Sequence, residues 1–176
     1  METRIPYENA RELIQSGDII FICNKGLFHH KLITWFTRSE HIHVGIAFWA
    51  TIENSRHLMI TEANGGAQRR IVNLSHYKDH QLDILTGPRE WEDIKDRALA
   101  RLGQVQYNWI QAGYIGVTEK FESVFGFKLP EIDMPGEICS EFVADVLGLE
   151  FNHMSPAALY RHLLRDFGCR LRARSQ

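Results

Sequence analysis

The stretch at residues 41–49 constrains the fold more than any other part of the chain. It reads His-Ile-His-Val-Gly-Ile-Ala-Phe-Trp, in which large apolar residues alternate with small or polar ones. Alternation with a period of two predicts a β-strand with two chemically different faces. One face would carry Ile42, Val44, Ile46 and Phe48, and the other His41, His43, Gly45 and Ala47. We therefore expect the fold to be built on a sheet.

The rest of the sequence contains both strand-like and helix-like patterns. Short apolar runs predict further strands at residues 18–23, 58–63, 70–74 and 81–85, with a polar turn at 53–57. Apolar residues at helical spacing predict helices at residues 7–16, 27–37, 90–102, 139–147 and 155–164. Gly17 and Gly103 suit the ends of two of these helices, and the basic residues 169–176 are strand-like. Together these patterns predict an α+β fold, with a small antiparallel sheet or partial barrel packed against helices.

Length and charge exclude several classes of protein. The 176 residues contain no repeat or linker, which predicts a single domain over residues 1–176. A net charge of −2 does not indicate the basic face of a nucleic-acid-binding protein. No window holds the roughly 20 apolar residues of a membrane-spanning helix, so we expect no transmembrane segment. Three scattered cysteines and the absence of a secretion signal predict a cytoplasmic protein, with export or association with a virus particle left open.

Cys139 is the first candidate for chemistry, because it opens a predicted helix directly after a loop that contains Pro135 and Gly136. The helix dipole and the free backbone N–H groups at such a position favour a thiolate over a thiol. The same N–H groups can hold an oxyanion during acyl transfer. The alternative is a small buried cysteine without a chemical role, which is common for free cysteine.

His43 and Glu62 are the candidate partners of this thiol. A histidine held on a strand is a rigid base that exchanges protons near neutral pH. If the strands form a hairpin with residues 43 and 62 opposite each other, Glu62 can orient the imidazole. Asn64 and Gln68 lie nearby in the sequence and are substitutes for that role. Alternatively, His43 is a half-buried structural histidine and Glu62 a solvated strand end.

A metal site is an alternative use of these residues. Alternation puts His41 and His43 on one face, where they could act as a pair of ligands, with Glu62 or Cys139 as the third. Zinc hydrolases normally carry a helical His-x-x-x-His motif or a cysteine cluster, and the sequence has neither. We therefore expect neither a metal nor another cofactor.

Several motifs, read in order, resemble one family. They are Gly17-Asp-Ile-Ile-Phe, His41-Ile-His-Val-Gly-Ile46, Thr61-Glu-Ala and Ile138-Cys-Ser-Glu-Phe-Val143, supported by Gly103-Gln-Val-Gln-Tyr107 and Ser155-Pro-Ala-Ala-Leu159. The set resembles the circularly permuted branch of the NlpC-type papain-like cysteine hydrolases, the YiiX-like group related to lecithin retinol acyltransferase. As in that branch, the histidine strand precedes the cysteine helix. The resemblance covers roughly residues 16–160.

The resemblance implies a permuted papain-like fold, with Cys139 as nucleophile, His43 as general base and Glu62 as the residue that orients His43. Tyr107 would line the site and assist the oxyanion. Asn108 departs from the pattern, because an acidic residue often follows that tyrosine. Residues 109–127 match no motif of the family, and their aromatic part, including Phe125, would shape the substrate pocket or belong to the core.

The reaction that the resemblance implies is hydrolysis through a thioester on Cys139. The expected substrate is an amide in a peptide or a peptidoglycan fragment. One alternative is a hydrolase or acyltransferase acting on a lipid-like amide or ester. A second alternative is a binding module that keeps the fold without catalysis.

Overall fold

The computed structural model describes residues 5–23, 40–64, 69–100, 102–103, 138–150 and 154–175. Within these residues six strands form one sheet, in the order β4-β3-β2-β1-β5-β6, and all neighbouring strands are antiparallel. The strands are β1 (Ile19–Cys23), β2 (His41–Ile52), β3 (Ser55–Ala63), β4 (Arg69–Asn73), β5 (Leu82–Leu85) and β6 (Leu171–Arg174). The sheet is open, with β4 and β6 at its edges. The predicted α+β class is confirmed, and the sheet does not close into a barrel.

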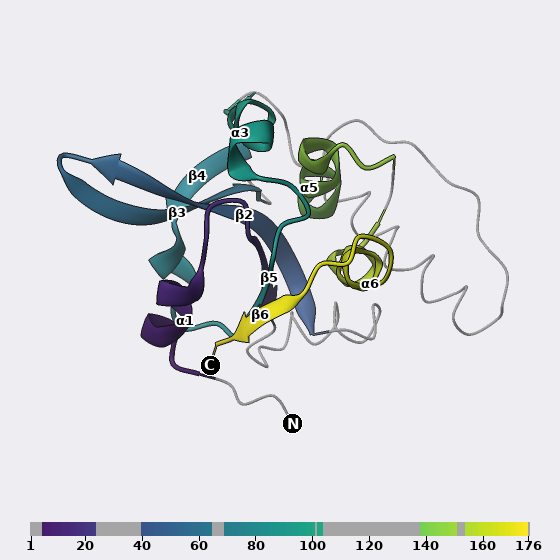
Figure 1. The fold of residues 1–176 in the computed structure, drawn as a ribbon, viewed down its shortest axis with the longest axis horizontal. Coiled ribbons are helices and arrows are strands. Elements are labelled where there is room, and N and C mark those ends of the chain that lie inside the picture. The colour runs from purple at the N-terminus through teal and green to yellow at the C-terminus, as the bar shows by residue number, and fades with distance from the viewer. Residues whose placement is uncertain are drawn as a thin grey trace, which may run out of the picture.

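Helices cover both faces of this sheet (Figure 1). They are α1 (Tyr7–Leu13), the short 3-10 helix η1 (Leu74–Tyr77), α3 (Trp91–Leu99), α5 (Cys139–Leu147) and α6 (Pro156–Asp166). One core joins α3, α5 and α6 to one face of the sheet, which is called the helix face below. A second core joins α1 and η1 to the opposite face. Because both faces are covered, the central strand β1 is apolar and buried over its whole length.

The expected boundaries agree with the structure best where a cap fixes them. Helix α5 has the predicted limits, and Gly148 ends it in the left-handed conformation, with φ 68°. Ser155 caps α6 by accepting a hydrogen bond from the Ala158 amide. In contrast, α1 ends before Gly17, because Ile14 is already extended. The predicted helix at residues 27–37, Gln68, Tyr107, Asn108, residues 109–127 and Phe125 lie outside the described residues.

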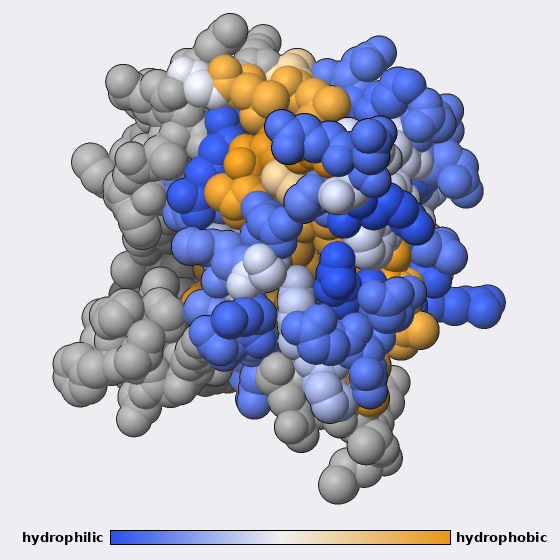
Figure 2. Space-filling model, turned by 90° about the vertical axis from the view of Figure 1, so that its left-hand side faces the viewer, coloured by the Kyte–Doolittle hydropathy of each residue, from blue (hydrophilic) through white to orange (hydrophobic). Residues whose placement is uncertain are grey.

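The β2–β3 hairpin is longer than predicted. Its loop has only two residues, Glu53 and Asn54, both with positive φ, and Ser55 already pairs with Ile52. Two-residue loops with positive φ match the twist of the strands that they connect. The polar residues 55–57 therefore belong to β3, and the expected turn at 53–57 was too long. Figure 2 looks at the side of the molecule from which this hairpin projects and shows apolar side chains in its upper part, bordered by hydrophilic ones.

A bulge near the start of β2 corrects the expected alternation. Ile22 pairs with His43 and Cys23 with His41, so that Ile42 is an extra residue in β2. The ring of His41 lies on the helix face, with its centroid 4.1 Å from that of Tyr160 in α6. His43 lies on the opposite face, 6.1 Å from the ring of Tyr77. The prediction that His41 and His43 share one face was therefore wrong, and they do not form a pair of metal ligands.

No helix among the described residues is both long and apolar enough to cross a membrane.

Candidate functional site

Cys139 occupies the first position of α5 and is almost fully buried. The carboxylate of Glu141 turns back and accepts a hydrogen bond from the Ile138 amide, at 3.1 Å, which fixes the start of the helix. The hydroxyl of Ser140 donates to the Met154 carbonyl, so the first turn of α5 is also tied to the segment before α6. The thiol is therefore held at a rigid helix N-terminus, where backbone N–H groups lack helical partners.

His43 lies in the part of β2 beyond its last pair with β3, Ile46 with Thr61. There it meets Glu62 and is also near Cys139 at the start of α5. His43 Nε2 lies 2.9 Å from Glu62 Oε2, and the Glu62 side chain is 0% exposed. The hairpin register pairs Ile46 with Thr61, so its continuation places Glu62 opposite Gly45 rather than opposite His43. The expected register was wrong by two residues, but a shift of two keeps both side chains on one face. They meet as diagonal neighbours.

The Glu62 carboxylate is the centre of a hydrogen-bond network. Arg70 in β4 donates to Oε1 from Nε at 2.8 Å and lies 2.7 Å away through a second nitrogen. The Tyr77 hydroxyl in η1 lies 2.8 Å from Oε2 and 3.0 Å from Oε1. Asn64 donates to Oε1 at 3.3 Å, and so supports Glu62 rather than replacing it. Sequence reasoning missed Arg70 and Tyr77, because only the strand pairing and the 3-10 turn bring them to Glu62.

Cys139 and His43 interact across the boundary between helix and sheet. The thiol is near enough to the imidazole for its charge to raise the pKa of His43. Because Nε2 is bonded to Glu62, the nitrogen left for the sulfur is Nδ1. The structure thus brings together the three residues that the sequence singled out: Cys139 from α5, His43 from β2 and Glu62 from β3.

Neighbouring charged groups shift the pKa values of His43 and Glu62. Burial by itself disfavours the imidazolium, but the Cys139 thiolate and the Glu62 carboxylate outweigh burial and raise the pKa of His43 to about 10. Burial also opposes the Glu62 carboxylate, yet its bonds to His43, Arg70 and Tyr77 lower the pKa of Glu62 to about 2. A buried carboxylate, an imidazole and a thiol in this order are suited to nucleophilic attack and proton transfer.

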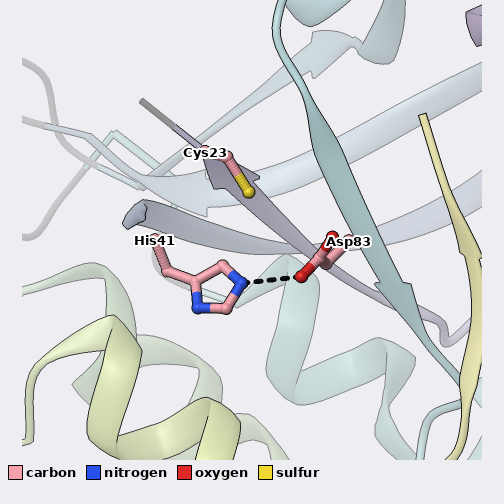
Figure 3. A group of neighbouring side chains, drawn as sticks. All are labelled: Cys23, His41 and Asp83. Atoms are coloured by element: carbon pink, nitrogen blue, oxygen red, sulfur yellow. Dashed lines mark hydrogen bonds and ion pairs between the residues drawn. The ribbon is translucent and has the colours of Figure 1, made fainter. Parts of the chain in front are cut away.

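A second group of reactive side chains lies on the helix face. Cys23, His41 and Asp83 are all buried, and their donor atoms lie within 4.8 Å of one another (Figure 3). Sequence reasoning considered His41 as a metal ligand, but with the wrong partners. An acidic residue inside the apolar strand 82–85 was the available signal for Asp83, and the bulge that turns His41 toward it has no signature in the sequence.

The chain matches no known family model and no curated protein. Among solved structures, it is similar to the metalloprotein yiiX from Escherichia coli O157:H7, a protein of the group DUF1105. The two share 16% sequence identity and a TM-score of 0.48, over 92% of this chain and 87% of the other.

Proposed function

We propose that the protein is a thiol-dependent hydrolase of the permuted papain-like class, with Cys139 as nucleophile, His43 as general base and acid, and Glu62 as the residue that orients His43. One observation carries the proposal. A cysteine at the N-terminus of α5 lies near enough to His43 to raise its pKa, and Nε2 of this histidine is 2.9 Å from a buried carboxylate. Nucleophile, base and orienting group in this order are the arrangement used for acyl transfer.

The reaction would take place in two steps. The Cys139 thiolate attacks the carbonyl carbon of the substrate, and the backbone N–H groups at the start of α5 stabilise the resulting oxyanion. The C–N bond breaks, His43 donates its proton to the departing amine, and a thioester remains on Cys139. His43 then takes a proton from water, the hydroxide attacks the thioester, and the carboxylic acid leaves as the thiol is restored. Glu62 stays ionised throughout and stabilises the imidazolium.

An amide of a peptide or peptidoglycan fragment is the proposed substrate, on the strength of the motifs shared with the hydrolase family. A lipid-like amide or ester is the alternative, and so is a binding module without turnover. These possibilities differ in what accumulates on Cys139, because only a working nucleophile becomes acylated.

Alkylation tests the nucleophile without a known substrate. Iodoacetamide at mildly acidic pH should label Cys139 well ahead of Cys169, because burial raises the pKa of the Cys169 thiol to about 11. Glu62→Gln should slow labelling of Cys139 and leave Cys169 unchanged. Equal labelling of the cysteines in the folded wild-type protein would contradict the proposal.

Acylation tests turnover. With p-nitrophenyl acetate as an activated probe, the wild-type protein should form an acetyl thioester on Cys139, visible as a mass increase, and release acetate continuously. Cys139→Ala should do neither, while its circular dichroism spectrum stays that of the wild type. Unchanged turnover by Cys139→Ala would disprove the mechanism. A stable acetyl adduct without release would instead favour an acyltransferase.

A further inference from the structure

Three strands direct metal-binding atoms toward one point on the helix face. Cys23 ends β1, His41 begins β2 just before the bulge at Ile42, and Asp83 lies in β5. All three side chains are buried, and their donor atoms lie within 4.8 Å of one another. His41 Nε2 is 2.9 Å from Asp83 Oδ2. Thiolate, imidazole and carboxylate are the three types of ligand that proteins offer to zinc.

The orientation of the His41 ring does not fit a second nucleophile–base pair. In a nucleophile–base pair, one ring nitrogen of the histidine bonds to the carboxylate and the other faces the sulfur. In Figure 3, the nitrogen bonded to Asp83 is on the side of the ring nearer Cys23, and the other nitrogen points away from both. The sulfur, one nitrogen and one oxygen therefore face a common centre, which is the arrangement of a metal site.

The dimensions fit a small divalent ion. Zinc bonds of 2.0–2.3 Å place neighbouring donor atoms roughly 3.5 Å apart in a tetrahedral site. The longest separation here, within 4.8 Å, needs only a small inward movement of one side chain. Thiolate and carboxylate together carry two negative charges, and Arg174 beside the carboxylate offsets one of them, so the site is net negative and attracts a cation. Water can fill the fourth position, as it does at other sites with three protein ligands.

The surroundings hold the ligands in place. Arg174 Nε lies 3.3 Å from Asp83 Oδ1, the oxygen that does not face His41, so it fixes the carboxylate without occupying the donor atom. The His41 ring packs between Phe21 and Tyr160, with centroids 5.2 and 4.1 Å away. Partners that orient the ligands in this way are a regular feature of protein metal sites.

We propose that Cys23, His41 and Asp83 bind one Zn²⁺ ion, which joins β1, β2 and β5 on the helix face of the sheet. This site shares no residue with the Cys139, His43 and Glu62 group: His41 contacts Asp83, whereas His43 contacts Glu62. It differs from the expectation drawn from the sequence, which considered His41 only together with His43. The ion would link three strands of the core and so stabilise the fold.

Cobalt provides the direct test, because Co²⁺ occupies zinc sites and its bond to a thiolate gives a charge-transfer band in the near ultraviolet. The chain has three cysteines, so the double variant Cys139→Ser/Cys169→Ser keeps Cys23 as the single thiol. After removal of metal by dialysis against a chelator, this variant should bind one equivalent of Co²⁺ with the thiolate band. One equivalent of Zn²⁺ should displace the cobalt and raise the melting temperature.

Single changes of the ligands complete the test. Cys23→Ser should abolish the thiolate band, and His41→Gln and Asp83→Asn should weaken Co²⁺ binding at least about tenfold, since even partners of the ligands change metal affinity 10- to 100-fold. Circular dichroism checks that each variant is folded. If a ligand variant fails to fold, the double variant that keeps Cys23 still decides the question. The proposal is overturned if that variant binds no stoichiometric Co²⁺, or binds it without the thiolate band.

Discussion

Glu62 has a buried side chain whose two oxygens contact four other residues. Its carboxylate contacts His43, Arg70, Tyr77 and Asn64. A buried charge is stable only when it is paired and hydrogen-bonded in this way. The residue that orients His43 is therefore also a residue on which the stability of the fold depends.

Tyr77 and Tyr7 allow us to compare the stability contributed by a tyrosine hydroxyl that contacts Glu62 with that of a buried hydroxyl that does not. Both are buried in the same core, but the Tyr77 hydroxyl contacts Glu62, whereas the Tyr7 hydroxyl has no hydrogen-bond partner among the described residues. Tyr77→Phe should lower the free energy of unfolding by about 1.5–3 kcal/mol, the usual contribution of a hydrogen bond to a charged group. Tyr7→Phe should be neutral or slightly stabilising. Urea denaturation measures both, and equal effects would mean that the Tyr77–Glu62 bond contributes nothing.

Stability should fall on the acidic side because of Glu62. The fold lowers the pKa of this carboxyl from 4.5 to about 2, so the folded state prefers the ionised form more strongly than the unfolded state does. The resulting stabilisation is complete above pH 4.5 and disappears as the pH falls toward 2, with a total of about 3 kcal/mol. Glu62→Gln should lack this part of the pH dependence. The control Glu92→Gln, at an exposed site, should retain the wild-type profile.

At the level of elements, the close contact between β2 and β3 sets the geometry of the site. Gly45 in β2 stands where any side chain would meet β3: a Cβ atom there would lie 2.8 Å from the Thr61 carbonyl oxygen and from the Ile60 side chain. The neighbouring strand therefore fills the space that a side chain at this position would need. A glycine at this position lets Glu62 approach His43.

Gly45→Ala should accordingly affect both stability and reactivity. We expect a loss of about 1–3 kcal/mol from overpacking, together with slower alkylation of Cys139, because β3 must move relative to His43. Gly168→Ala is the control: its Cβ would meet nothing within 4 Å, although φ is +64°. It should cost about 1 kcal/mol of backbone strain and leave alkylation unchanged. Normal alkylation in folded Gly45→Ala would show that the spacing of the two strands does not set the reactivity of Cys139.

The sequence predicted those elements and residues that local patterns determine. The limits of α5, the N-cap of α6 and the strand character of β2 follow from capping residues and alternation, and the same patterns singled out Cys139, His43 and Glu62. What depends on the pairing of distant segments could not be predicted. The bulge at Ile42, the two-residue offset between β2 and β3, and the contacts of Arg70 and Asp83 are set by tertiary packing.

At the scale of the whole molecule, the candidate site is divided between two layers. The thiol belongs to α5, while the imidazole and the carboxylate belong to the sheet on which α5 packs. Neither layer contains a complete site. The reactivity of Cys139 therefore reports whether the two layers are docked.

This division predicts that reactivity and fold are lost together. In increasing urea, the preference of iodoacetamide for Cys139 over Cys169 at mildly acidic pH should disappear in the same transition as the circular dichroism signal, as expected for cooperative unfolding. If the preference persisted in the unfolded chain, it would come from the local sequence around Cys139 and not from His43.

The two ends of the described chain lie next to each other. Ile5 forms a parallel bridge with Ser175 and donates its amide to the Arg174 carbonyl at 2.9 Å. A short peptide could thus close the backbone into a ring without disturbing the sheet. Such a ring would have fewer unfolded conformations and should melt at a higher temperature. It would also have no first or last element, so whether the cysteine or the histidine comes first would depend only on where the ring is cut.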